Sequence, residues 1–184
     1  VLRRMGRQYS VEAYLELVAR LRAAVPGISL TTDVITGFCG ETEAQFERTL
    51  ELLRTVRFDQ VFAAAYSERP GTPATRLPDD IPAVEKKRRL NELLSVQEGI
   101  GLERNESWLG RHTEVLVEEA RQPRAHDHEA AEHRGPRLVG RNREHKLVHF
   151  DGSESLVGSL VAVSIQRAGP YALSGQLVEE QDHA

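Results

Sequence analysis

Two short apolar runs, separated by a segment with helical periodicity, constrain the fold of this chain more than any other feature of its 184 residues. The first run is rich in β-branched residues and stops at Gly37, and the second follows about 30 residues later. Between them, Thr42 and Gln45 have the spacing of a capping box at a helix start. The periodicities predict helices over 10–25 and 42–56, and strands over 28–34 and 59–66. Strands that alternate with helices at this spacing indicate parallel strands in an α/β fold.

The sequence pattern changes near Gly110. Before it, a proline-rich connecting loop over 67–82 leads into a strongly charged helix predicted over 83–109. After it, the pattern predicts short strands over 113–119, 138–141, 146–150, 160–168 and 171–179. Short alternating strands separated by turn residues are typical of a small antiparallel β-barrel or β-sandwich. We therefore expect two domains, covering 1–109 and 110–184.

Composition narrows the class of protein. The formal net charge of −4 excludes a uniformly cationic nucleic-acid binder, and no apolar run approaches the roughly 18 residues of a membrane span. No signal-peptide pattern is present, so we expect a cytoplasmic protein with no membrane partner. The only cysteine, Cys39, can form neither an intrachain disulfide nor an iron–sulfur cluster by itself.

Val1, Leu2 and Met5 have helical spacing without a cap before them, which predicts a fragment that starts inside a helix. An alternative start codon would also explain the initial valine.

The strongest candidate for a ligand site is the run TTDVITGFCGET at 31–42. Here a strand ends, Gly37 and Gly40 allow a tight turn, and a capped helix begins. Parallel α/β folds bind ligands at this edge of the sheet. Asp33 strengthens the expectation, because an acid inside an apolar strand needs a ligand hydroxyl or a buried arginine as its partner. Glycines that serve only turn geometry are the alternative interpretation.

A second candidate is the run YSERPGTP at 66–73, beyond the second predicted strand and at the same face. Arg69 is suited to bind an anion or a carboxylate, and a surface loop with one ordinary salt bridge is the alternative. Cys39 is expected to be inert, because no histidine lies in the first domain to activate it.

The second domain contains a local basic cluster on two predicted strands and their turn, made of Arg137, Arg141, Arg143, His145 and Lys146. The domain as a whole carries nine Lys and Arg against twelve Asp and Glu, so any RNA binding would depend on this cluster. A solvated hairpin is the alternative. His126, His128 and His133 have a loosely metal-like spacing, but their charged loop favours solvated side chains over metal ligands.

Motifs along the whole chain occur in one order: RRMGRQYS, TTDVITGFCGET, YSERPGTPAT, QEGIGLERNESWLGR, and GRNREHKLVHF with AGPYALSGQLVEE. Together they resemble the C-terminal part of the radical-SAM methylthiotransferases. The arginine in YSERPGT favours the branch of that family that acts on tRNA. Cys39 stands where the family usually has proline in GFPGET, which bears on the rigidity of that loop.

The resemblance implies an enzyme with an N-terminal iron–sulfur domain, a radical-SAM partial (β/α) barrel with a second [4Fe–4S] cluster, and a C-terminal TRAM β-barrel that binds RNA. This chain would contain the last half of the partial barrel and the TRAM domain, with both sets of cluster cysteines in a missing N-terminal half. In the family reaction, cleavage of S-adenosyl-L-methionine (SAM) gives a radical that activates an N6-prenylated adenosine beside the anticodon, and a second SAM methylates the added sulfur. The implied partner is the tRNA anticodon stem-loop. The chain alone would be inactive and would hold no catalytic residue or metal ligand.

The same resemblance assigns candidate residues. SAM contacts are expected from Arg7, Asp33, Gly37, Phe38 and Gly40. Contacts at the substrate face are expected from Tyr66, Arg69 and Gly71, and RNA contacts in the TRAM domain from Arg141, Arg143, Lys146 and Tyr171. An arginine suits the SAM carboxylate and an acid suits the ribose hydroxyls. Two alternatives stay open: a methylthiotransferase that acts on threonylcarbamoyl-adenosine in tRNA, and a stand-alone RNA-binding remnant without catalysis. Two parallel strands with an unpaired edge are also expected to leave apolar surface exposed.

Overall fold

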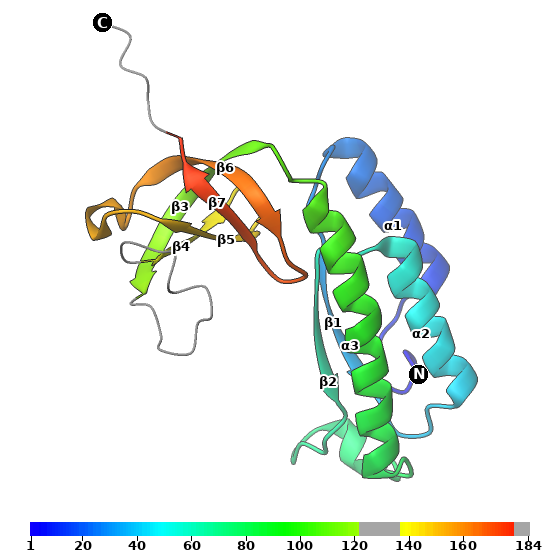
Figure 1. Ribbon diagram of the computed structural model, residues 1–184. Coiled ribbons are helices and arrows are strands. Elements are labelled where there is room, and N and C mark those ends of the chain that lie inside the picture. The colour runs from blue at the N-terminus through cyan, green and yellow to red at the C-terminus, as the bar shows by residue number, and fades with distance from the viewer. Residues whose placement is uncertain (122–136, 179–184) are drawn as a thin grey trace, which may run out of the picture. The chain divides into compact units, whose positions relative to one another are not determined.

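The computed structural model describes residues 1–121 and 137–178, which fold into two compact units, Val1–Ile100 and Gly101–Ala184 (Figure 1). The first unit contains α1 (Val11–Ala24), β1 (Thr31–Thr36), α2 (Glu43–Val56), β2 (Gln60–Ala65), a short 3-10 helix η1 (Pro73–Arg76) and most of α3 (Ala83–Glu106). The second unit contains β3 (His112–Arg121), β4 (Arg137–Asn142), β5 (Leu147–Asp151), η2 (Glu154–Leu156), β6 (Leu160–Ala168) and β7 (Leu173–Leu177). The division lies inside α3, and the domain boundary near residue 110 stays a prediction. Among the described residues, no helix is long and apolar enough to cross a membrane.

The first unit packs three helices against one face of a two-stranded parallel sheet (Figure 1). Its core joins side chains from the three helices and both strands, including Val18 of α1, Val61 of β2 and Leu93 of α3. The predicted apolar stripe of α2 faces this core through Phe46, Leu50, Leu53 and Val56. The predicted capping box at the start of α2 is confirmed, with both hydrogen bonds between Thr42 and Gln45 present.

The opposite face of this sheet is exposed. In the parallel register, Asp33 of β1 lies beside Phe62 of β2, and Ile35 lies beside Ala64. The side chains of Ile35 and Phe62 are 46% and 55% exposed. Among the described residues, β1 pairs only with β2, as expected for strands that need further neighbours.

The first residues form a turn with the hydrogen bonds of a helix C-terminus: the Met5 N–H donates to the Val1 carbonyl oxygen at 3.1 Å, the Arg7 N–H donates to the Leu2 carbonyl oxygen at 2.9 Å, and Gly6 has a φ of 73°. The expectation that the chain starts inside a helix therefore stays a prediction. One prediction about local structure is wrong. The first strand begins at Thr31 rather than at residue 28. The reason is that the Leu30 N–H donates to the Asp59 carboxylate, at 2.9 Å, instead of entering a strand ladder.

The second unit is a closed barrel with strand order β3-β4-β5-β7-β6. All neighbouring strands are antiparallel except β5 and β7, which pair in parallel. β-bulges follow Val117 in β3 and Ile165 in β6, and bulges bend strands into the corners that a small barrel needs. Gly140 and Gly175 lie near these bulges, where a Cβ would collide with the backbone of the adjacent strand. The predicted fold class, an α/β unit followed by a small β-barrel, is confirmed.

Candidate functional site

Arg7 and Asp33 line one cleft of about 740 Å³ between the N-terminal segment, α1, β1 and α2. Asp33 is exposed on the uncovered face of the sheet, so its position does not by itself require the ligand hydroxyl or buried arginine that the sequence led us to expect. Both residues were expected from the resemblance to contact SAM, and that role stays a prediction. Of the other predicted SAM contacts, Gly37, Phe38 and Gly40 are not among the residues that line it.

The loop between β1 and α2 is a tightly bonded turn. Gly37 and Gly40 have φ values of 69° and 68°, a conformation that favours glycine. The Gly37 N–H donates to the Glu41 carboxylate at 2.7 Å, and the Gly40 N–H donates to Asp80 at 2.6 Å. The Gly40 carbonyl oxygen accepts from Arg4 at 2.8 Å. These backbone groups are therefore fixed by side chains from three separate segments.

A buried ion pair fastens this loop to α3. The side chains of Glu41 and Arg89 are 3% and 6% exposed, and their charged atoms lie 2.9 Å apart. Arg89 also donates to the Glu41 carbonyl oxygen at 2.9 Å. A buried charge needs such a partner, so each residue depends on the other.

Burial of Arg89 and Lys86 was not predicted, because the inward face expected for this strongly charged helix consisted of its leucines, Gln97 and Ile100. A signal was present in the spacing. Lys86 and Arg89 continue the buried stripe of Leu93, Gln97 and Ile100 at intervals of three and four residues.

Three buried side chains meet at the C-terminal ends of β1 and β2: Phe38, Cys39 and Tyr66. The rings of Phe38 and Tyr66 pack edge to face, with centroids 4.9 Å apart. Burial, and then the neighbouring Cys39 thiol, raise the pKa of the Tyr66 hydroxyl above its ordinary value of about 10. Tyr66 therefore stays neutral and serves as a packing surface, while its backbone starts the second candidate loop.

The second candidate loop presents Arg69 and Gly71 to solvent. Gly71 has a φ of 82°, and the Arg69 carbonyl oxygen accepts from the Thr72 hydroxyl at 2.9 Å. The loop is held to α3 through Asp79, which forms an ion pair with Lys86 at 2.6 Å. The structure thus brings the two candidate loops together at one edge of the sheet.

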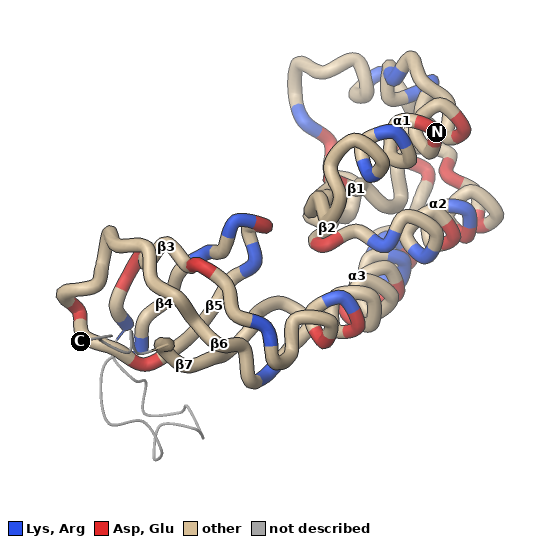
Figure 2. The backbone as a smooth tube through the Cα atoms, turned by 90° about the horizontal axis from the view of Figure 1, so that it is seen from above, with Lys and Arg blue, Asp and Glu red and all other residues tan. Residues whose placement is uncertain are grey.

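Three of the four candidate RNA residues of the barrel, Arg141, Arg143 and Lys146, lie at or beside the turn between β4 and β5, where Figure 2 shows Lys and Arg positions close together. Asn142 organises this turn, because its side-chain oxygen accepts from the backbone N–H of Lys146 at 2.9 Å. Arg141 donates to the His145 carbonyl oxygen and lies 3.5 Å from the Glu118 carboxylate. Arg143 is exposed.

Lys146 and Tyr171 differ from each other in how their side chains are held. The Lys146 ammonium group donates to the Asn105 side chain at 2.8 Å, so this predicted RNA residue also holds the last turn of α3. Tyr171 is 64% exposed, which leaves its ring open for stacking.

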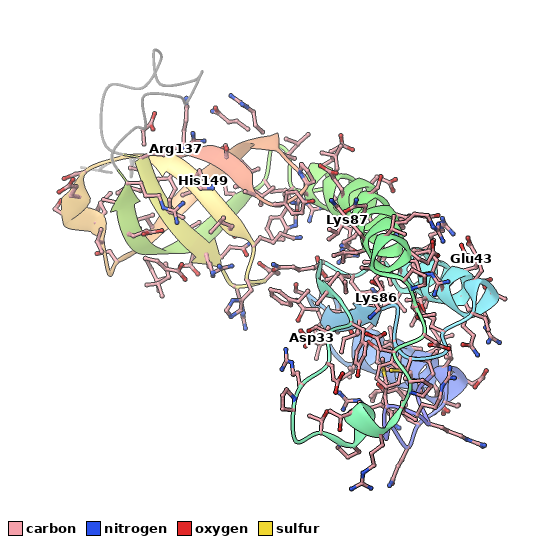
Figure 3. All side chains as sticks on the ribbon, turned by 90° about the horizontal axis from the view of Figure 1, so that it is seen from below. Asp33, Glu43, Lys86, Lys87, Arg137 and His149 are labelled. Carbon is pink, nitrogen blue, oxygen red and sulfur yellow. The ribbon has the colours of Figure 1, made fainter. Side chains whose placement is uncertain are left out.

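Half-buried His149 of β5 was not predicted to be a site residue, although it follows Lys146 by three positions. Burial, and then the charges of Arg137 and Arg121, lower the pKa of His149 below 6.5. Figure 3 labels His149 and Arg137 close together on the barrel.

Residues 1–121 and 137–178 contain no group of three or more His, Cys, Asp or Glu side chains that could hold a metal ion. His126, His128 and His133 lie outside the described residues, so their predicted solvation stays a prediction.

Comparison with known proteins gives two findings. Residues 1–53 match the family model described as the radical SAM superfamily. This match covers the segment that carries Arg7, Asp33 and the two glycines of the β1–α2 loop.

The particular relatives are proteins named tRNA-2-methylthio-N(6)-dimethylallyladenosine synthase. The chain is 46% identical to the one from Moorella thermoacetica and 44% identical to the one from Carboxydothermus hydrogenoformans, over 97% of its own length and 38% of theirs. It is 42% identical to the one from Geobacillus kaustophilus, over 98% of the chain and 32% of that protein. The chain therefore spans about a third of the length of the curated relatives that it matches. This similarity confirms the resemblance to the radical-SAM methylthiotransferases that its motifs predicted.

Proposed function

We propose that this chain is the C-terminal portion of a tRNA methylthiotransferase that adds a 2-methylthio group to an N6-prenylated adenosine next to the anticodon. The observation that carries the proposal is the 42–46% identity to synthases of that name over nearly the whole chain. The cleft that Arg7 and Asp33 line also supports the proposal, because a guanidinium suits the carboxylate of SAM and a carboxylate suits its ribose hydroxyls.

In this proposal Arg7 binds the carboxylate of SAM and Asp33 accepts hydrogen bonds from its ribose hydroxyls. When bound to a reduced iron–sulfur cluster, SAM supplies a carbon radical that abstracts hydrogen. The cluster ligands are proposed to come from polypeptide outside this chain, which has one cysteine. The loop that carries Arg69 faces the modified nucleotide.

The barrel is proposed to be a TRAM domain that binds the anticodon stem-loop. Arg141, Arg143 and Lys146 attract RNA phosphates, and the exposed Tyr171 ring stacks on a base. The working partner of the chain is therefore tRNA.

A chimera tests the enzyme proposal. The upstream part of the Moorella thermoacetica synthase is joined to this chain and expressed in a bacterial strain that lacks the tRNA-modifying enzyme. We expect mass spectrometry of the tRNA to detect 2-methylthio groups on prenylated adenosine, and the Asp33→Asn chimera to lose most of them. A folded, SAM-binding chimera that modifies no prenylated adenosine would contradict the proposal.

The same experiment separates the two alternatives. Methylthio groups on threonylcarbamoyl-adenosine instead of prenylated adenosine would favour the other tRNA-modifying branch. RNA binding that depends on Arg141 and Lys146, without any modification, would favour a binding remnant.

A further inference from the structure

Lys86 is an unusual residue to find in the interior of this unit. Its side chain is 9% exposed, whereas the next residue, Lys87, is exposed (Figure 3). Burial of an ammonium group is unfavourable unless hydrogen bonds and an opposite charge compensate. The contacts of Lys86 therefore indicate why a lysine occupies this position.

Those contacts lie at both ends of one loop. The Lys86 ammonium group donates to the Tyr66 carbonyl oxygen at 3.3 Å, where the loop starts, and to both carboxylate oxygens of Asp79 at 2.6 Å, where it ends. The twelve residues 67–78 between these anchors form a compact surface loop whose ends meet, as in an Ω-loop. Lys86 closes the neck of this loop.

The same lysine packs against the first candidate loop. A Cβ placed on Gly37 would lie 2.5 Å from the Lys86 Cγ, so the glycine backbone and the lysine chain are in close contact. The Lys86 ammonium group also lies 5.0 Å from the centroid of the Tyr66 ring, within the range of a cation–π interaction.

Asp80 makes a second connection between the loops. It follows Asp79 in the chain, and its carboxylate accepts from the Gly40 N–H at 2.6 Å. The two adjacent aspartates therefore attach the end of the 67–78 loop to α3 and to the β1–α2 loop respectively.

We propose that Lys86 is a positioning residue that closes the neck of the 67–78 loop and holds this substrate-facing loop against the β1–α2 loop. It touches no reacting group. It acts through Tyr66, Asp79 and Gly37, so that Arg69 is presented from a fixed frame. The functional part of this inference rests on the proposed tRNA substrate, whereas closure of the neck does not.

The experiment uses the 184-residue chain and compares Lys86→Met with the matched control Lys87→Met, which changes an exposed lysine on the same helix. Protease Glu-C, which cleaves after Glu68, and trypsin, which cleaves after Arg76, report opening of the loop. We expect cleavage at both sites to be about ten times faster in Lys86→Met and unchanged in Lys87→Met. A decrease of about 1.4 kcal/mol in the free energy of loop opening raises the population of the open loop tenfold.

The second measurement is fluorescence anisotropy with an anticodon stem-loop RNA that carries N6-dimethylallyladenosine, across a range of salt concentrations. We expect Lys86→Met to weaken binding about fivefold without changing the slope of log affinity against log salt, because Lys86 is buried away from phosphates. Arg69→Ala should weaken binding and also reduce that slope by roughly 0.7, as expected for loss of one phosphate contact. Lys86→Arg, which keeps a cation near Asp79, should recover most of the affinity.

Asp79→Asn provides a second route if Lys86→Met folds poorly, because Asp79 is 37% exposed and the change is isosteric. Faster cleavage with unchanged RNA affinity in either variant would overturn the positioning role. Unchanged cleavage in both variants would overturn closure of the neck. If the unmodified chain binds no RNA, the proposed function fails in this chain while the protease rates still decide whether Lys86 closes the loop.

Discussion

Gly37 occupies a position where any larger residue would be unfavourable for two reasons. Its φ of 69° is unfavourable for a residue with a Cβ, and that Cβ would lie 2.5 Å from the Lys86 Cγ. Gly71 shares the positive φ, at 82°, but has nothing within 4 Å of the added atom. Substitution of Gly71 therefore tests backbone strain alone, whereas substitution of Gly37 tests backbone strain together with a steric clash.

We expect Gly71→Ala to lower the free energy of unfolding by about 1 kcal/mol and Gly37→Ala to lower it by about 3 kcal/mol. The larger loss at Gly37 reflects displacement of the buried Lys86 side chain in addition to backbone strain. Urea unfolding of the two variants, followed by circular dichroism, measures the difference. Equal losses would show that Lys86 moves aside without cost.

Glu85 gives the stability of the chain a defined dependence on pH. Hydrogen bonds from Arg88, and then from Arg89, hold the pKa of Glu85 at about 2, below its ordinary value of 4.5. Because the folded-state pKa is depressed, the stabilisation is complete above about pH 4.5 and disappears as the pH falls toward 2.

The melting temperature of Glu85→Gln should therefore lie below that of the unmodified chain at pH 6, and the gap should close between pH 4.5 and pH 2. Thermal unfolding at several pH values tests this expectation. The same comparison in an Arg88→Met background should give a smaller gap at pH 6, because the first of the two partners is then missing. A gap that widens on acidification would contradict the assignment.

At the scale of the element, α3 carries adjacent arginines with opposite environments. Arg89 is buried against Glu41, whereas the Arg88 side chain is 44% exposed and pairs with Glu43, Glu85 and Glu92. Exposed ion pairs contribute little to the free energy of unfolding, whereas removal of one partner from a buried pair leaves a buried charge without an opposite charge beside it.

We expect Arg89→Met to reduce the free energy of unfolding by about 3 kcal/mol or more, and Arg88→Met to reduce it by less than about 1 kcal/mol. Guanidinium chloride would screen the charges, so urea is the suitable denaturant. The double variant Glu41→Gln with Arg89→Met should recover part of the loss. Similar values for the two single variants would mean that the buried pair is no stronger than a surface pair.

Local signals determined most of the elements in advance. The capping box at Thr42, the stripe of α2 and the short alternating strands of the barrel each arise from neighbours in the sequence, so periodicity was sufficient to predict them. The contacts of Asp79 and Asp80 were not predictable in this way. They join residues 7 and 40 positions apart through side chains, and such contacts have no periodic signature. The parallel pairing of β5 and β7 was missed for the same reason, because strand patterns do not encode partners.

At the scale of the whole molecule, the described residues leave one sheet face without a cover. Phe62 and Ile35 lie on this face beside Asp33, and contiguous exposed apolar surface favours association. This observation agrees with the expectation that two parallel strands alone would expose apolar area.

Phe62→Ser should therefore decrease binding of the dye ANS and decrease self-association, while changing the free energy of unfolding by no more than about 0.5 kcal/mol. Light scattering after size-exclusion chromatography measures the association. Val157→Ser, at a 44% exposed position in the barrel unit, is the control and should leave both signals unchanged. Persistence of association in Phe62→Ser would place the contact surface elsewhere.

Evolutionary change in the length and sequence of the 67–78 loop is affected by the neck that Lys86 closes. The Tyr66 carbonyl oxygen and the Asp79 carboxylate meet at one ammonium group, so both ends of 67–78 are held at one point. Ala74 and Leu77 also pack against the buried cluster of Phe38, Cys39 and Tyr66, which ties this part of the loop to the scaffold. Loop closure penalises added length only weakly. The exposed tip that includes Arg69 and Gly71 can therefore change in length and sequence while the sheet and α3 stay the same.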